Sequence, residues 1–245
     1  MYNTVPVPCR AVVCGDSIAA GVLFDEQSGR YTKDENGFVH TLQTEWNGSI
    51  LNLGKFGNTV GRALPRLRRH LDKESPDLVL IELGGNDSDF NWKAIASAPH
   101  AEHTPATPVE EFERLLGAAV ENLRTREILP VLCTLPPVDV DRYLKHVCGD
   151  DASMMEPLLE WLGNVTHIYW WHERYNAAIL RVARRTGAYW VDIRGAFLAD
   201  PDFPRFICAD GIHPNHEGQA LIARSLETEL RIRRPDLLKT PDLVH

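Results

Sequence analysis

Short apolar runs alternate with longer segments of helical periodicity along the chain. Five runs end at or just before glycine, proline or polar residues, at 11–14, 50–53, 78–83, 131–134 and 189–193. Continuous runs of this length are typical of strands buried on both faces of a parallel sheet. The alternation of strand and helix predicts right-handed crossovers, with helices covering both faces of that sheet.

Helical periodicity separates the apolar runs. Apolar residues recur every three or four positions over 60–71, 168–185 and 215–233, and from Phe112 to Leu123. Before Phe112, Thr107 is placed to cap a helix, with Pro108 at its first position and Glu110 completing a capping box. Residues 25–37 are polar and predict a surface loop.

One connection is longer than the minimal α/β unit needs. Residues 138–165 include Met154, Met155, Leu158 and Trp161, which predict a short apolar helix. A connection this long within a compact domain is often functional, so we expect a lid; the alternative is an insertion packed on the domain edge. The expected organisation is therefore a single domain over 1–245 with a lid insertion at 138–165.

Composition is that of an ordinary globular protein. Of 245 residues, 44% are hydrophobic and 24% are charged, which argues against disorder as the main state. The formal net charge of −8 disfavours nucleic acid and anionic membrane surfaces as partners. No apolar run approaches the ~18 residues of a membrane span. The first ten residues lack the features of a secretory signal, so we expect a cytoplasmic protein, with a secreted mature form left open.

Cysteine and histidine spacing gives no metal motif. The five cysteines are odd in number and contain no CxxC pair, so reduced, mostly buried thiols are expected. The segment from His213 to Glu217 is not His-Glu-x-x-His and has no acidic or cysteine partner at a suitable spacing. We therefore predict no metal.

The residues that follow the predicted strands carry the candidate chemistry. In open parallel sheets, ligands bind outside the carboxyl ends of the strands. Ser17 follows the first strand, Gly57 the second and Asn86 the third, and Asp210 and His213 precede the last helix. Singly, each has an ordinary interpretation as a helix cap, a turn residue or a surface pair.

Together these residues supply the parts of an acyl-transfer site. A serine nucleophile needs a histidine base, and that base needs a carboxylate to orient it. Asp210 and His213 are three residues apart, so one tight turn can hold both. The backbone N–H groups of Ser17 and Gly57 and the side-chain amide of Asn86 are candidate donors to an oxyanion.

In these segments the sequence resembles the SGNH hydrolases, also called the GDSL esterase/lipase family. Four blocks occur in order: 15–17 (Gly-Asp-Ser), 52–59 around Gly57, 84–87 (Gly-Gly-Asn-Asp) and 210–214 (Asp-Gly-Ile-His-Pro). The resemblance implies a flavodoxin-like three-layer α/β/α sandwich with a central parallel five-stranded sheet in the order 2-1-3-4-5.

The resemblance also implies roles by position. Ser17 is the nucleophile, His213 the base and Asp210 its orienting carboxylate, while Ser17, Gly57 and Asn86 form the oxyanion hole. Asp16 and Asp87 are expected to be structural. Ile18 stands where the family often has leucine, and the 138–165 insertion prevents transfer of a substrate class.

Two groups of aromatic residues lie near these blocks. Trp92 follows the oxyanion asparagine closely and is expected to bind substrate. The cluster His167, Tyr169, Trp170, Trp171 and His172 is open to two interpretations, a helix that packs its aromatic rings into the core and a platform for a sugar.

The expected function is that of a cofactor-independent serine esterase acting on small-molecule esters through an acyl-enzyme. Short acyl groups, such as acetyl on a carbohydrate, fit the modest pocket that we expect. The alternatives are a lysophospholipase or thioesterase, and a binding protein that has lost catalysis. A phosphate or flavin binder at the Ser17 loop would leave Asp210 and His213 without a role. The sequence does not indicate an oligomeric state.

Overall fold

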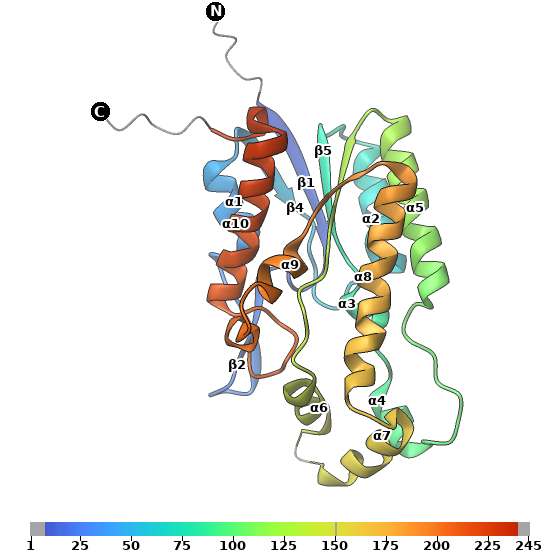
Figure 1. Ribbon diagram of the computed structural model, residues 1–245. Coiled ribbons are helices and arrows are strands. Elements are labelled where there is room, and N and C mark those ends of the chain that lie inside the picture. Colours follow the sequence, from blue (N-terminus) through green and yellow to red (C-terminus); the bar gives the residue numbers. More distant parts are fainter. Residues whose placement is uncertain (1–7, 150, 240–245) are drawn as a thin grey trace, which may run out of the picture.

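A computed structural model describes residues 8–149 and 151–239 of the chain. The expected absence of a secretory signal rests mostly on residues before position 8, which lie outside the described residues. The centre of the structure is a parallel sheet with the strand order β4-β1-β5-β6-β7 (Figure 1). The strands are β1 (Cys9–Gly15), β4 (Gly48–Asn52), β5 (Leu78–Glu82), β6 (Leu129–Cys133) and β7 (Tyr189–Val191). Numbered within the sheet this is 2-1-3-4-5, which confirms the predicted order.

The inner strands bury both faces because their side chains alternate between two apolar cores. In β1, Ala11 and Val13 contribute to one core, while Val12 and Cys14 contribute to the other. The edge strand β4 differs, since most of its residues are exposed. The expectation of burial on both faces is therefore wrong for β4, which has a neighbouring strand on one side only.

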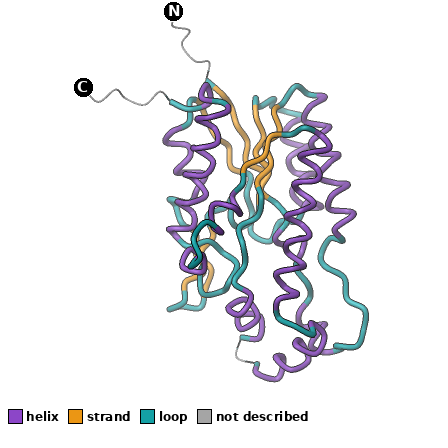
Figure 2. Tube along the Cα trace, in the orientation of Figure 1, coloured by secondary structure: helices purple, strands orange, loops and turns teal. Residues whose placement is uncertain are grey.

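Helices cover both faces and complete the predicted α/β/α layers (Figures 1 and 2). One face carries α1 (Phe38–Glu45), α9 (Ile193–Leu198) and α10 (His216–Arg233). The other carries α2 (Val60–Leu71), α5 (Val109–Thr125) and α8 (Thr166–Thr186). The helical periodicities over 60–71, 168–185 and 215–233 are thus confirmed.

The proposed capping box at α5 is wrong. The helix begins at Val109 after Pro108, and no side chain caps it. The Thr107 backbone N–H instead donates to the Asp87 carbonyl, and the Thr107 side chain hydrogen-bonds the Asp87 carboxyl group. Thr107 therefore ties two loops together rather than closing its own helix.

The predicted loop at 25–37 is partly a hairpin. Strands β2 (Val22–Asp25) and β3 (Arg30–Lys33) pair antiparallel outside the main sheet. All four residues of β3 are exposed, so this strand has no apolar alternation for sequence to reveal.

A third apolar cluster lies beyond one end of the sheet. It joins α4 (Trp92–Ser97), α6 (Val140–Cys148) and α7 (Met155–Leu162), which group below the sheet in Figure 1. The short apolar helix predicted within 138–165 is α7, and sequence reasoning missed α6. Shorter elements complete the described chain: α3 (Gly85–Ser88) and 3₁₀ turns at Ala152–Met154, Phe203–Phe206 and Pro235–Leu237.

All five cysteines are buried and unpaired, as expected. Among the residues that the structure describes, no helix combines the length and apolar character needed to cross a membrane.

Phe112 tests the core beneath α5. It is fully buried and packs edge-on against Tyr175 of α8, with ring centroids 5.2 Å apart. We expect Phe112→Ala to lower the free energy of unfolding by about 3–5 kcal/mol, because lost burial and a cavity add together. Urea denaturation measures this, with the exposed Ile232→Ala as the control that changes it by less than about 0.5 kcal/mol.

Candidate active site

Ser17, His213 and Asp210 meet at the carboxyl edge of the sheet. His213 Nε2 lies 2.8 Å from Ser17 Oγ, and His213 Nδ1 lies 2.5 Å from Asp210 Oδ2. A carboxylate only accepts hydrogen bonds, so Nδ1 carries the proton and Nε2 is free to accept from the serine hydroxyl. This is the arrangement required to remove a proton from Ser17.

Asp210 is held as a charged group in a fully buried position. Burial opposes its ionisation, but hydrogen bonds from the His213 ring and from the backbone of His213 and Ile212 prevail and lower the pKa of Asp210. Its Oδ1 accepts those two backbone N–H groups at 3.1 and 3.2 Å. The turn therefore fixes both the charge and the direction of the carboxylate.

Two of the three expected oxyanion donors line the same cavity as His213. These are Ser17 and Asn86, whereas Gly57 is absent from the lining and its neighbour Phe56 is present. Gly57 adopts a φ of 70°, which glycine tolerates best. Asn58 Nδ2 donates to the Gly15 carbonyl at 2.8 Å and thereby holds this turn against the end of β1.

Asp16 orients both the serine turn and Asn86. Its Oδ1 accepts the Ile18 N–H at 2.9 Å, and its Oδ2 accepts from Asn86 Nδ2 at 3.1 Å. Since an amide nitrogen has two hydrogens, this bond leaves one Asn86 N–H for another acceptor. Burial raises the pKa of Asp16 to about 6, against the lowering effect of the Ile18 N–H and His213.

Glu82 lies fully buried at the end of β5, next to Asp16. Burial and the neighbouring Asp16 charge raise the pKa of Glu82 well above its usual value. Neither carboxyl oxygen has a well-formed hydrogen bond among the described residues. The raised pKa favours the protonated acid at Glu82, a feature that the sequence motifs did not reveal.

Asp87 connects the third block to α2. Both of its carboxylate oxygens lie 3.1 Å from the Val60 N–H, so Asp87 caps a helix from a distant loop. Burial raises the pKa of Asp87 to about 6, opposed by the Thr107 and Val60 hydrogen bonds. The hydrogen bonds seen for Asp87 thus tie the third block to the start of α2.

Aromatic rings cover His213 on two sides. Phe56 stacks nearly parallel to the imidazole, with centroids 6.1 Å apart, and Tyr31 meets it edge-on at 5.2 Å. Tyr31 also hydrogen-bonds His146 of α6, with Oη and Nε2 2.9 Å apart. The hairpin and α6 therefore meet above the triad, and neither contact was anticipated from sequence.

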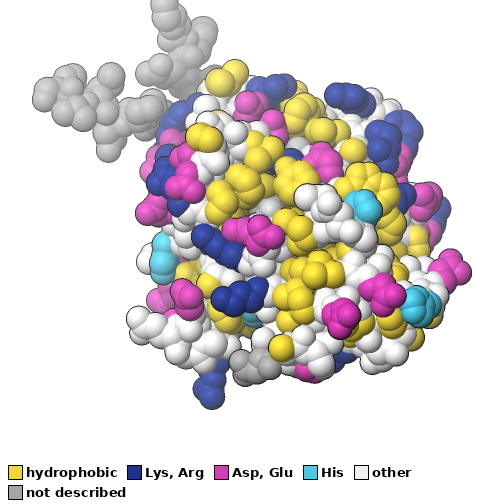
Figure 3. All heavy atoms as spheres, turned by 60° about the horizontal axis from the view of Figure 1, so that its bottom comes forward, with side chains coloured by type: hydrophobic (Ala, Val, Ile, Leu, Met, Phe, Trp, Pro, Cys, Tyr) yellow, Lys and Arg dark blue, Asp and Glu magenta, His cyan; other side chains and the backbone are white. Residues whose placement is uncertain are grey.

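A cavity of about 720 Å³ extends from Ser17 beneath α4, α6 and α7. Aromatic side chains from six segments line it, namely Tyr31, Phe56, Phe90, Trp92, Tyr143, Trp161, Trp170 and Trp171. Seen from this end, hydrophobic side chains run through the middle of the face (Figure 3). The cavity is larger and more apolar than the modest pocket expected from sequence.

Trp92 lines this cavity but is itself largely buried. Its indole N–H donates to Asp89 Oδ1 at 2.7 Å and lies 3.0 Å from the Tyr143 hydroxyl. The ring edge is therefore engaged within the protein, which leaves the ring surface for any ligand.

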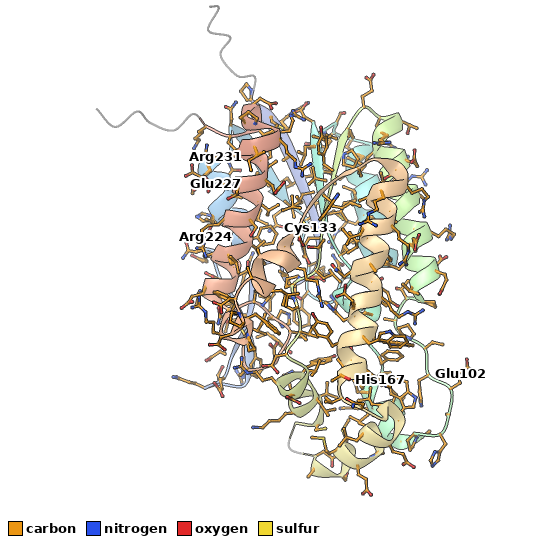
Figure 4. The ribbon with its side chains drawn as sticks, in the orientation of Figure 1. Glu102, Cys133, His167, Arg224, Glu227 and Arg231 are labelled. Atoms are coloured by element: carbon orange, nitrogen blue, oxygen red, sulfur yellow. The ribbon has the colours of Figure 1, made fainter. Side chains whose placement is uncertain are left out.

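The aromatic cluster of α8 serves the cavity as well as the core. His167, Trp170, Trp171 and His172 line the cavity, while Ile168 and Tyr175 of the same helix join the apolar clusters. His167 lies at the end of α8 beside α7 (Figure 4). Core packing alone, one of the two interpretations left open from sequence, therefore does not describe this helix fully, because part of its aromatic cluster lines the cavity.

A family model and two curated relatives all place this chain among lipases and esterases. The model of the GDSL-like lipase/acylhydrolase family matches residues 13–221. An arylesterase of Vibrio mimicus is 39% identical over 92 residues, which span 36% of this chain and 44% of the arylesterase, less than half its length. An acetylxylan esterase of Geobacillus stearothermophilus is 21% identical over 196 residues, covering 79% of this chain and 77% of that protein.

Solved structures agree on the fold. The structure of a lipase/acylhydrolase from Enterococcus faecalis superimposes with a TM-score of 0.66 at 20% identity, covering 94% of this chain and 97% of that one. At this identity the likeness concerns the arrangement of strands and helices.

Glu82 provides a test of the buried carboxyl pair. A folded-state pKa above the unfolded value means that the folded protein binds the extra proton, so this contribution to stability is lost as pH rises. Glutamine does not ionise, so we expect Glu82→Gln to remove this fall in the free energy of unfolding with rising pH. Relative to wild type, the variant should gain at least about 1 kcal/mol in free energy of unfolding between pH 5 and pH 8.

Urea denaturation at the two pH values measures the gain. Glu102→Gln, on the exposed loop between α4 and α5 (Figure 4), is the matched control and should follow the wild-type pH dependence. Parallel pH dependences for Glu82→Gln and wild type would show that Glu82 is ionised in the folded protein.

Proposed function

The chain belongs to the GDSL-like lipase/acylhydrolase family and is an ester-bond hydrolase, and we propose that it is a cofactor-independent serine esterase that works through an acyl-enzyme. The observation that carries this proposal is the continuous hydrogen-bonded path from Ser17 Oγ through His213 to Asp210.

The first half-reaction acylates Ser17. The Ser17 oxygen attacks the ester carbonyl carbon while its proton passes to His213 Nε2. The bond between that carbon and the alcohol oxygen then breaks, and His213 returns the proton to the departing alcohol. Asp210 stays ionised throughout and stabilises the imidazolium.

The second half-reaction releases the acid. Water loses a proton to His213 as it attacks the acyl carbon, and Ser17 regains a proton when it leaves. In both halves we assign the negative oxygen to the backbone N–H groups of Ser17 and Gly57 and the side chain of Asn86. The bond from Asn86 to Asp16 supports this by fixing the direction of the amide.

We propose a short-acyl ester of a carbohydrate or a similar small molecule as substrate. The acetylxylan esterase relative and the aromatic rings of the cavity, including Trp92, support this. The apolar character and volume of the cavity favour a second candidate, a lysophospholipase or thioesterase with a longer acyl chain. The acyl-length optimum separates the two.

We further propose one catalytic domain whose residues 138–165 act as a lid. Support comes from Tyr143, His146, Val147, Trp161 and Leu162 of that segment, which line the cavity. The five unpaired, buried cysteines fit a reducing compartment and support a cytoplasmic location.

Replacement of Ser17 tests the mechanism. We expect Ser17→Ala to lower kcat for p-nitrophenyl acetate by more than about a thousandfold, because the nucleophile is lost. It should also abolish covalent labelling by a fluorophosphonate, in which the serine oxygen displaces fluoride from phosphorus. Ser28→Ala, on the exposed hairpin tip, is the matched control and should leave both unchanged.

The same assay run from acetate to palmitate esters sizes the acyl site. An optimum at two to four carbons supports the carbohydrate esterase, and an optimum at eight or more supports the lipase-type candidate. Folded wild-type protein that resists the fluorophosphonate would instead identify a binding protein without catalysis.

Trp161→Ala tests the lid. Trp161 of α7 packs edge-on against Phe90, with centroids 5.0 Å apart, at the cavity wall. We expect its removal to change the acetate-to-octanoate ratio of kcat/KM by about tenfold while Tm falls by less than about 4 °C. Leu159→Ala on the exposed side of α7 is the control. A large fall in Tm with an unchanged ratio would indicate a packed insertion.

A further inference from the structure

His172 is a polar side chain in the wall of an otherwise aromatic cavity. It comes from α8, is 8% exposed, and lies next in sequence to Trp170 and Trp171, which line the same wall. The proposed mechanism gives it no role. A buried imidazole in such a wall needs hydrogen-bond partners, so its surroundings indicate its function.

A chain of polar groups fixes His172 from behind. The Leu135 N–H donates to Asn176 Oδ1 at 3.1 Å, and Asn176 Nδ2 donates to Glu173 Oε1 at 3.1 Å. Glu173 Oε2 pairs with Arg194 Nε at 2.7 Å. Arg194 Nη1 then lies 3.4 Å from His172 Nδ1. Each side chain is thus oriented by the one before it.

Arg194 is itself well anchored. It is 5% exposed, its guanidinium lies 4.7 Å from the centre of the Tyr169 ring, and Nη1 also lies 3.4 Å from the carbonyls of Leu135 and Pro136. Leu135 and Pro136 follow β6 and Arg194 follows β7, at the sheet edge that carries Ser17, whereas Tyr169 belongs to α8. The arginine therefore cannot turn away from His172 without losing several partners.

The arginine determines which His172 nitrogen carries the proton. A guanidinium only donates hydrogen bonds, so Nδ1 must accept and the proton of the neutral ring lies on Nε2. Burial and the Arg194 charge lower the pKa of His172 to about 3, so the ring stays neutral at working pH. Among the described residues no protein group hydrogen-bonds Nε2, and the ring borders the cavity.

We propose that His172 is a specificity-determining residue that donates its Nε2–H to an oxygen of the alcohol part of the substrate. The inference rests on the proposed function in one respect. A short acyl group offers its carbonyl oxygen alone, and that oxygen is assigned to Ser17, Gly57 and Asn86. The acceptor for His172 is then a hydroxyl or ring oxygen of the alcohol, as in an acylated sugar.

Two esters with rings of equal size test this proposal. Methyl 3-O-acetyl-β-D-xylopyranoside carries hydroxyl and ring oxygens, whereas cyclohexyl acetate carries neither. We expect His172→Phe to lower kcat/KM for the xyloside by about tenfold or more, because a donor is lost from a buried site. For cyclohexyl acetate kcat/KM should change by less than threefold.

Two further variants separate hydrogen bonding from packing. His172→Gln keeps an N–H donor and should recover most of the activity toward the xyloside. His40→Phe, on the exposed surface of α1, is the matched control and should leave both esters unaffected. Parallel losses for the two esters, or a xyloside loss below threefold, would overturn the proposal.

A binding measurement keeps this result independent of catalysis. Calorimetry with the intact xyloside and Ser17→Ala should give a Kd about tenfold weaker when His172→Phe is added. If wild-type protein hydrolyses neither ester, the proposed function fails for these substrates, and the same Kd ratio still decides the role of His172. Equal affinities, or no binding by the Ser17→Ala protein, would overturn it.

Discussion

The burial of carboxyl groups at one edge of the sheet is the constraint on which the site depends. A buried carboxylate is tolerated only when N–H or O–H donors surround it, so each one draws loops together. Asp16 joins the serine turn to Asn86, Asp87 joins the third block to α2, and Asp210 closes its own turn around His213. These bonds fix the positions of the loops that follow four of the strands. The cavity lies in the space between those loops.

Sequence predicted the sheet and the triad because both leave local marks. The inner strands are continuous apolar runs, and Ser17, Asn86, Asp210 and His213 stand in short blocks at strand ends. The exposed edge strand β4, the polar strand β3 and the role of Thr107 were misjudged for a common reason. Each depends on surroundings that local apolar periodicity does not record: β4 lies at the edge of the sheet, β3 is fully exposed, and Thr107 bonds to Asp87 in another loop.

The wall of the cavity shows the same limit more sharply. Helix α8 carries apolar and aromatic residues at helical spacing, and that spacing is equally consistent with a core and with a ligand site. Only the tertiary structure separates Tyr175, which packs against Phe112, from Trp171, which faces the cavity. Glu82 illustrates a related case, since burial and the nearby Asp16, rather than any motif, raise its pKa.

The buried thiols have a consequence for chemical labelling. Thiolates, rather than thiols, react with maleimides, and burial raises the pKa of Cys14 to about 12 and of Cys9 and Cys208 to about 11. Burial likewise raises the pKa of Cys133 and Cys148. A cysteine introduced at an exposed position of α7, such as Glu156→Cys, is therefore the preferred site for a fluorophore on the otherwise native chain. Such a reporter would show whether α7 moves during turnover, without prior removal of the natural cysteines.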